Sequence, residues 1–430
     1  MMVSVMIIAG VQAEDLPEWQ KKLPRTLQAD FPYTKAAIRQ SFPKNAVTNK
    51  GIAIIVGREA FMCFDTDLLR WSAGWTGNYL TEDGVSFRGN HGASPRIAGN
   101  QKFGSAALAG WADAQGSFAD PRKEPFGPLP RAQAKWRGCY VVDDTVVLSY
   151  TVGDVQFLEQ PGSVELDGQT AFVRSLQHGA LNAAVATLVC EVENAQGGVE
   201  DGVAILVSGD MVTQVALVNA PKGAALEVQE NKRIVAKLAK GTAAGAFQIR
   251  IWSGSKADHG KFAALVKAPV KAEFRKVGKN RWPEPVVTQG VMNSSKTPDG
   301  AYATDVITAP ERNPWNRRVR FGGLDFFSDG NRAALSTWDG DVWIVEGLKN
   351  ENFKDLNWTR FASGGFETLG LKIVDDVIYT SGRDEITRYH DLNNDGAADH
   401  YESFNNDITS SQGFHEFVFD LHTDKEGNFY

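Results

Sequence analysis

The sequence has few cysteines, no long hydrophobic run beyond its first residues, and no excess of basic charge. Only 3 cysteines occur among 430 residues, and neither Cys-x-x-Cys-His nor a paired Cys/His spacing is present. This excludes a covalently attached haem in this chain, and no paired Cys/His spacing suggests zinc. No later segment reaches the roughly 18 apolar residues that a membrane span requires. A net charge of -7 makes nucleic acid a poor candidate partner.

The three cysteines, Cys63, Cys139 and Cys190, each lie in an apolar, strand-like segment, which is typical of buried thiols. One disulfide is compatible with three cysteines and would leave one thiol over.

The N-terminus has the pattern of an export signal. Residues 1–10 are apolar apart from Ser4, and Val11 and Ala13 place small residues before acidic Glu14 and Asp15. This predicts a signal peptide at residues 1–13 and a periplasmic or secreted protein. The usual basic residues before the apolar run are missing, and a buried N-terminal strand is the alternative.

The middle of the chain alternates short β-type runs with turn residues. We expect residues 14–50 to form an N-terminal extension and residues 51–254 to form a β-sandwich-like domain. Trp71, Trp75 and Trp111 offer stacking surfaces for a sugar, although core packing is the commoner fate of such residues.

Residues 255–315 have the features of a helix followed by a linker. Phe262, Leu265 and Val266 have helical spacing, and Pro269, Pro283 and a Ser/Thr/Asn-rich stretch follow them.

A repeat is the most informative feature of residues 316–430. Similar segments begin at Gly323, Gly370 and Glu416, at intervals of 47 and 46 residues. A period of about 45 residues is typical of four-stranded propeller blades. The first unit predicts strands at residues 323–327, 332–338, 341–346 and 357–362, and the second at 369–374, 376–381, 384–391 and 398–404; a third begins at 416–420.

The sequence therefore predicts a mostly β protein, in which the sandwich-like domain is followed by the first two to three blades of a β-propeller. Because propellers close with about four to eight blades, we expect a fragment of a longer protein. A small open sheet packed on the N-terminal domain is the alternative.

Blade topology assigns loop residues to two faces. The loops that enter the first strand and join the second to the third share one face, which carries Arg320, Trp338, Asp339, Arg383, Asp384 and His415. Guanidinium groups suit anionic ligands, and an imidazole can act as a base. An Arg383–Asp384 pair and an ordinary surface histidine are the alternative.

A calcium-type loop lies on the other face, at residues 391–402. It places oxygen ligands at Asp391, Asn393, Asp395, Asp399 and Glu402, with the Ala397 carbonyl at position 7 and Gly396 at the turn. This spacing matches the twelve-residue Ca²⁺ loop, and the strand-like flanks argue against an EF-hand. A solvated Asp/Asn turn without metal is the alternative.

At residues 320–325, 380–386 and 391–402 the chain resembles glucose/sorbosone dehydrogenase-like propellers of large secreted bacterial proteins. Residues 64–77 and 104–130 resemble the uncharacterised domain that precedes such propellers. The resemblance implies sugar or aldehyde oxidation with pyrroloquinoline quinone, with His415 as base and Arg383 and Arg320 as quinone-carboxylate partners. It also implies a c-type cytochrome domain further along the full-length protein.

Two functions of different classes follow. The first is a fragment of an exported oxidoreductase-like protein that acts on a carbohydrate or another small polyol or aldehyde, inactive alone. The second is a non-catalytic extracellular module that binds carbohydrate or protein. A purely architectural role is a third reading.

Overall fold

The computed structural model describes residues 30–84, 87, 91, 94–123, 127–292, 304–413 and 415–430. The predicted signal peptide at residues 1–13 lies outside these ranges. The described chain is mostly β, and its sheets are antiparallel. In the described residues no helix has the length and apolar character needed to cross a bilayer.

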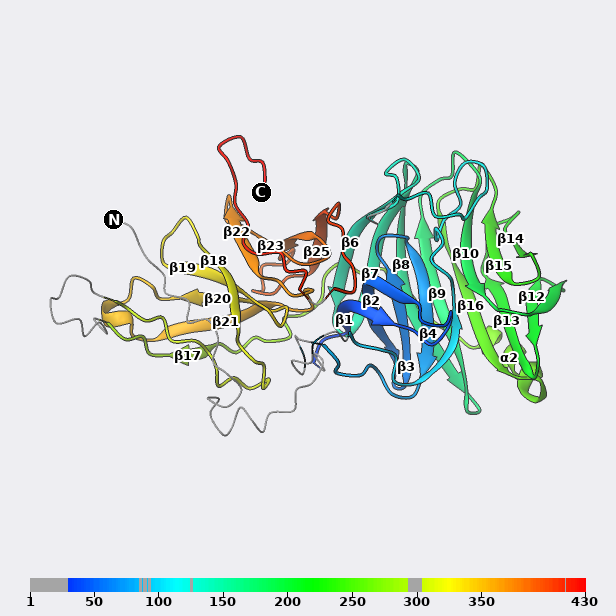
Figure 1. The fold of residues 1–430 in the computed structure, drawn as a ribbon, viewed down its shortest axis with the longest axis horizontal. Coiled ribbons are helices and arrows are strands. Elements are labelled where there is room, and N and C mark those ends of the chain that lie inside the picture. The colour runs from blue at the N-terminus through cyan, green and yellow to red at the C-terminus, as the bar shows by residue number, and fades with distance from the viewer. Residues whose placement is uncertain are drawn as a thin grey trace.

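Two sheets pack face to face in the N-terminal half (Figure 1). The eight-stranded sheet has the order β1-β2-β3-β4-β5-β10-β15-β14. Its strands are β1 (Tyr33–Arg39), β2 (Val47–Gly57), β3 (Ala60–Asp65), β4 (Arg70–Thr76), β5 (Asn100–Gly104), β10 (Val185–Glu191), β14 (Ala225–Gln229) and β15 (Arg233–Leu238).

The opposing sheet is longer, because the C-terminal part of the chain continues it. Its order is β11-β12-β13-β16-β9-β8-β7-β6-β25-β24-β23-β22. The strands from the N-terminal half are β6 (Ala134–Val142), β7 (Thr145–Val152), β8 (Val155–Leu166), β9 (Gln169–His178), β11 (Gln196–Glu200), β12 (Val203–Ser208), β13 (Met211–Val218) and β16 (Gly245–Ser255).

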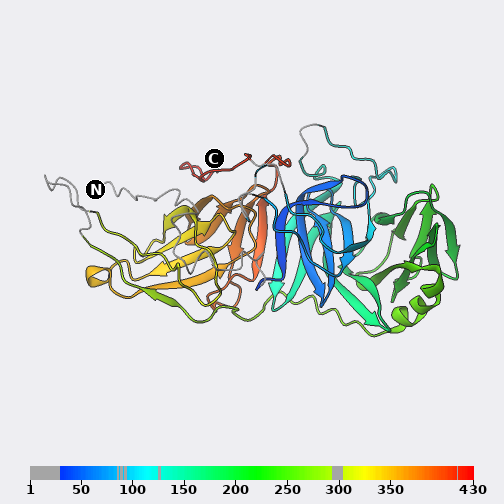
Figure 2. The same cartoon turned by 60° about the horizontal axis from the view of Figure 1, so that its bottom comes forward.

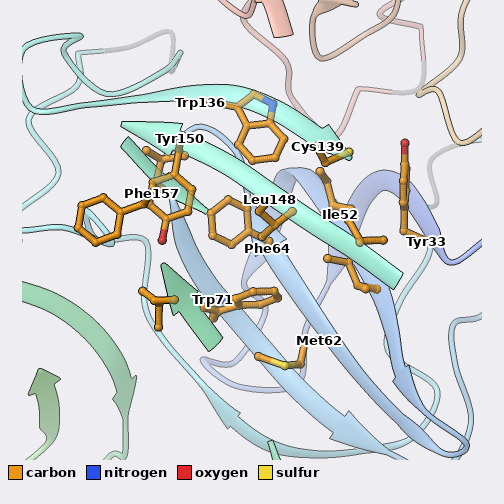
Figure 3. Packing of buried hydrophobic residues seen from close by; sticks show 14 of the residues in the cluster. Tyr33, Ile52, Met62, Phe64, Trp71, Trp136, Cys139, Leu148, Tyr150 and Phe157 are labelled. Atoms are coloured by element: carbon orange, nitrogen blue, oxygen red, sulfur yellow. The ribbon is translucent and has the colours of Figure 1, made fainter. Parts of the chain in front are cut away.

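Aromatic side chains from both sheets fill the space between them (Figure 3). Phe64 on β3 lies 5.7 Å from Trp136 on β6 and 6.0 Å from Tyr150 on β7, measured between ring centroids. Trp71, Trp75 and Trp111 are all at most 1% exposed. Of the two alternatives for these three tryptophans, core packing is the correct one.

The predicted extension at residues 14–50 is wrong for its described part. β1 and the start of β2 are members of the eight-stranded sheet, where Tyr33 pairs with Ile54. The sandwich-like domain therefore begins before residue 51. The segment YTKAAIR is short and carries a lysine, so the sequence alone did not distinguish it from a connecting segment.

The predicted helix is confirmed. A 3₁₀ turn, η1 (Lys256–Lys261), leads into α2 (Phe262–Lys267), and Phe262 and Leu265 are buried against Trp252 and its neighbours. An extended stretch then leads to β17 (Val286–Thr288).

The C-terminal half contains two four-stranded antiparallel meanders (Figures 1 and 2). The first meander consists of β18 (Phe321–Phe326), β19 (Arg332–Thr337), β20 (Val342–Glu346) and β21 (Leu356–Ala362), with η2 (Glu351–Phe353) before β21. The second consists of β22 (Gly370–Val374), β23 (Val377–Ser381), β24 (Ile386–His390) and β25 (His400–Asn405). The eight strands predicted for the two repeat units are thus present.

The third predicted unit is not a strand. Residues 416–420 have no strand assignment, although the Ser381 hydroxyl on β23 donates to the Asp420 carbonyl, and a Cβ at Gly370 on β22 would lie 2.2 Å from that oxygen. A strand needs hydrogen-bonded partners along its length, and residues 416–420 have no strand pairing.

The two halves meet where β25 pairs with β6, at what we call the domain junction. Tyr401 pairs with Cys139, and Glu402 pairs with Gly138. Gly138 has a φ of +107°, and a Cβ there would lie 2.0 Å from the Tyr401 carbonyl oxygen. Only glycine permits this approach of the two backbones.

Candidate functional site

Arg383 lies on the predicted functional face, but its guanidinium is used within the protein. Its Nη2 donates to the carbonyls of Gly413 at 2.7 Å and Ser411 at 3.2 Å, and its Nη1 pairs with Glu367 at 3.2 Å. The residue is 6% exposed. Arg383 therefore holds the segment 411–413 against the second meander.

Arg320 is paired in the same way. Two of its nitrogens bond to the two carboxylate oxygens of Asp339, at 2.9 and 2.7 Å, and Arg318 shares that carboxylate at 2.9 Å. The guanidinium carbon also lies 4.6 Å from the centroid of the Trp338 ring. Burial alone raises the pKa of the Asp339 carboxyl, but Arg320 and Arg318 outweigh it and lower the pKa.

An aromatic row extends from this pair. Trp338 meets Phe417 edge-on at 5.5 Å, and Phe417 lies 5.6 Å from Phe419. Phe419 is 71% exposed. His415 is exposed and lies 5.8 Å from the ring of His91. The segment 411–419 thus contacts Arg383 through the Ser411 and Gly413 carbonyls and contacts Trp338, beside Arg320, through Phe417.

Asp384 does not belong to this face. With Glu385 it forms a buried charge cluster around Lys35, whose Nζ lies 2.9 Å from the Asp384 carboxylate and also contacts Glu385. The Trp136 indole donates to Glu385 at 3.1 Å. Lys35, Asp384 and Glu385 are each at most 7% exposed. The predicted Arg383–Asp384 pair is therefore absent among the ion pairs of the described residues.

Burial and charge act against each other in this cluster. Burial alone lowers the pKa of Lys35, but the carboxylates of Asp384 and Glu385 outweigh it and raise the pKa above its usual value. Burial raises the pKa of Asp384, and Lys35 opposes that rise. Because substrates do not reach side chains this deeply buried, the cluster serves to hold β1 against the start of β24.

A second buried group of charges joins the first meander to residue 30. Arg360 pairs with Asp341 at 3.0 Å and with Asp30, and Arg317 pairs with Asp341 at 2.9 Å. The Arg360 guanidinium also lies 4.1 Å from the centroid of the Trp282 ring. Residues 30–35 therefore connect both meanders to the N-terminal sheets.

Sequence reasoning missed Lys35 and Asp30, because both lie in the segment assigned to an extension. A lysine within the apolar-flanked run YTKAAIR was the available signal, since lysine is rarely buried without a charged partner.

The predicted calcium loop lies between β24 and β25. Its side-chain oxygens accept backbone N–H groups: Asp391 from Asp395 and Gly396, Asn393 from Asp395, and Asp399 from Leu392 and Gly278. Gly396 has a φ of +90°, as the predicted turn requires. Burial raises the pKa of Asp399, and the nearby carboxylates of Asp395 and Asp391 add to the rise.

Glu402, the twelfth residue of that loop, has other partners. It accepts from Arg388 Nε at 2.7 Å and contacts His390 Nε2 at 2.7 Å. The first nine loop positions, residues 391–399, form the connection between the two strands. Glu402 instead lies on β25, where its side chain contacts side chains of β24.

Two surface cavities lie away from these residues. One, of about 460 Å³, lies between residues 285–286 and 312–316, and the other, of about 360 Å³, lies over β2, β7 and β8. Neither is lined by Arg320, Arg383 or His415.

A family model described as a domain of unknown function, DUF6797, matches residues 62–159. This range contains residues 64–77 and 104–130. No curated protein matches this chain.

Solved structures show only a distant similarity. The periplasmic domain of Thermotoga maritima YidC is 11% identical, covers 51% of this chain and 96% of its own, and has a TM-score of 0.27. YidC from the same organism is 12% identical, with coverages of 55% and 58% and a TM-score of 0.28. A functionally unknown protein from Desulfotomaculum acetoxidans DSM 771 is 10% identical, with coverages of 88% and 86% and a TM-score of 0.19.

Proposed function

We propose that this chain is a non-catalytic binding unit of an exported protein, and that its aromatic row holds carbohydrate. The row consists of Trp338, Phe417 and Phe419. The observation that carries the proposal is that Phe419 is 71% exposed at the end of this row. The Trp338 ring contacts that of Phe417, and the Phe417 ring contacts that of Phe419. Exposed aromatic faces suit the apolar faces of sugar rings.

Binding is better supported than quinone-dependent oxidation. The carboxylates of the quinone need accessible cationic partners. Arg383, however, is buried and bonded to Glu367 and two backbone carbonyls. Arg320 is bonded to both carboxylate oxygens of Asp339. The roles of His415 as base and of the two arginines as cofactor partners stay predictions based on the resemblance.

We also propose that the two meanders are propeller blades. Their first strands, β18 and β22, run side by side, as inner strands of neighbouring blades do. A Cβ at Gly323 would lie 2.2 Å from the Leu371 backbone nitrogen, so these strands approach at van der Waals contact. Export of the protein rests on the sequence of residues 1–13 alone.

Calorimetric titration with oligosaccharides of different linkage tests the binding proposal. We expect at least one to bind, and Phe419→Ala to weaken its affinity by about tenfold, which corresponds to the loss of one stacking contact. Phe326→Ala is the matched control, since Phe326 is 40% exposed and lies at the opposite end of β18. Equal affinity for the wild type and Phe419→Ala, or no binding at all, would contradict the proposal. Dye reduction with pyrroloquinoline quinone and an aldose would support the oxidoreductase instead.

We further propose that the loop at residues 391–399 binds Ca²⁺ in a structural role. The carboxylates of Asp391, Asp395 and Asp399 lie close enough to affect one another, and a cation relieves such repulsion. We expect Ca²⁺ to raise the melting temperature of metal-free protein but not that of a variant with Asp391→Ala and Asp395→Ala. Asp424→Ala, in another Asp/Asn turn, is the control. A melting temperature insensitive to Ca²⁺ would refute this role.

A further inference from the structure

Three side chains that can bind a metal lie on one face of the β24–β25 hairpin. His390 on β24 is directly opposite His400 on β25, and Glu402 follows two residues later on the same strand. Side chains two residues apart on a strand share a face. One potential ligand atom from each of the three residues lies within 4.8 Å of the others.

The orientation of these groups is set by their surroundings. The rings of His390 and His400 are 5.2 Å apart and nearly parallel, at 20°. The His400 ring also stacks on Tyr140 of β6, at 4.2 Å and 13°. His390 Nε2 lies 2.7 Å from a Glu402 carboxylate oxygen. The Nε2 atom of His400 is buried and has no hydrogen-bond partner among the described residues.

We propose that His390, His400 and Glu402 form a binding site for a divalent transition-metal ion of the Zn²⁺ class. Two imidazoles and one carboxylate are a ligand set that Zn²⁺ uses, and three protein ligands leave a fourth position for water. Imidazole also suits other first-row ions, whereas Ca²⁺ takes oxygen ligands. The site therefore differs in chemistry from the adjoining loop at residues 391–399.

Arg388 completes the arrangement as an outer partner. It is the cross-strand neighbour of Glu402, and its Nη2 lies 2.6 Å from the carboxylate. Carboxylates that bind metals are commonly held by such hydrogen bonds, which fix their orientation. The positive charge of the Arg388 guanidinium offsets the negative charge of the Glu402 carboxylate. Binding of the ion therefore depends largely on coordination by the nitrogen atoms of the two imidazoles.

The position of the site has a consequence for stability. An ion held by His390, His400 and Glu402 would cross-link β24 to β25 beside the pairing of β25 with β6. Because the ion binds the folded arrangement, it stabilises the folded state by RT ln(1 + c/Kd), where c is the free Zn²⁺ concentration, and this rises only with the logarithm of c once c exceeds Kd.

Titration of the full chain with Zn²⁺, after removal of metals by a chelator, tests the site. We expect one ion per chain at this position, a higher melting temperature, and visible absorption when Co²⁺ replaces Zn²⁺. His390→Ala and Glu402→Gln should each weaken Zn²⁺ binding by more than about 100-fold, because even outer partners cost roughly 10–100-fold.

His422→Ala is the matched control, since the His422 side chain is 73% exposed and lies outside the cluster. It should leave Zn²⁺ affinity unchanged. Circular dichroism and melting of each metal-free variant show whether it folds, and Glu402→Gln keeps the shape of the side chain. Failure of the wild type to bind Zn²⁺, or equal affinity in the wild type and the folded variants, would overturn the proposal.

Discussion

Lys35 makes a buried ionic contact between the two halves. It stands on β1, far along the chain from Asp384 and Glu385, yet its Nζ contacts both carboxylates in a buried setting. Removing one partner from a buried ion pair leaves an uncompensated charge, which costs far more than the loss of a surface pair.

We expect Lys35→Met to lower the free energy of unfolding by about 3–5 kcal/mol. Methionine keeps the length of the side chain but leaves two buried carboxylates without their cation. Lys271→Met is the control, since its side chain is 84% exposed and pairs only at the surface. Urea unfolding of both variants measures the difference, and similar values for the two would show that the cluster contributes little.

The buried carboxyl group of Asp67 should make the free energy of unfolding depend on pH. Burial raises the pKa of its carboxyl to about 6, while Lys50, at 3.0 Å, opposes the rise. Between about pH 4 and pH 6 the folded protein keeps a proton that the unfolded chain has released. The contribution of this group to the free energy of unfolding therefore decreases as the pH rises through that range.

An Asp67→Asn variant lacks this titration. The stability of the wild type relative to the variant should fall by up to about 3 kcal/mol between about pH 4 and pH 7. Urea unfolding at a series of pH values measures it, and Asp154→Asn, at an exposed turn, serves as the control. A difference that is constant, or that grows with pH, would contradict the assigned pKa.

At the scale of elements, local pattern predicted the meanders well. Asp329-Gly330 and Asp339-Gly340 mark turns in the sequence, and Gly330 and Gly340 have positive φ values in the structure, of 62° and 87°. The predicted strands fall at nearly the observed residues, because alternation and turn chemistry are local signals. The pairing of β6 with β25 carries no local signal, and sequence analysis did not find it.

Gly138→Ala tests the importance of that pairing. The variant would bring a Cβ to within 2.0 Å of the Tyr401 carbonyl oxygen, so β25 must move or detach. Gly153→Ala is the control, because it also has a positive φ, of +53°, but nothing lies within 4 Å of its Cβ.

Backbone strain should lower the free energy of unfolding of both variants by about 1 kcal/mol. We expect the steric clash in Gly138→Ala to lower it by roughly 1–3 kcal/mol more. Hydrogen exchange should also become faster in β25 for Gly138→Ala alone. Equal stability and exchange in the two variants would mean that the domain junction tolerates separation of these strands.

For the whole molecule, residues distant in sequence make one continuous structure. β25 extends the sheet of the N-terminal half, and the long axis of the molecule runs from that half to the meanders (Figure 1). Phe31 and Tyr33 pack with Tyr401 and Trp282, beside the pairs that Lys35 and Asp30 form. The sequence predicted two parts joined by a linker, because composition reports local boundaries and not the contacts that cross them.

In the candidate site, too, sequence patterns did not reveal contacts between residues that are distant along the chain. Blade topology predicted that Arg320, Arg383 and His415 share a face, but sequence spacing does not reveal that the two arginines are paired with Asp339, Glu367 and backbone carbonyl groups. The aromatic row arises from residues in two loops, and its neighbour relations follow only from the fold.

The central claim is that the N-terminal sheets and the two meanders form one folded unit that presents the aromatic row. Differential scanning calorimetry of the whole chain tests this most directly. We predict a single transition whose calorimetric and van't Hoff enthalpies agree, which Lys35→Met should shift to lower temperature as one peak. Two separate transitions in the wild type, with the calorimetric enthalpy well above the van't Hoff value, would contradict the claim.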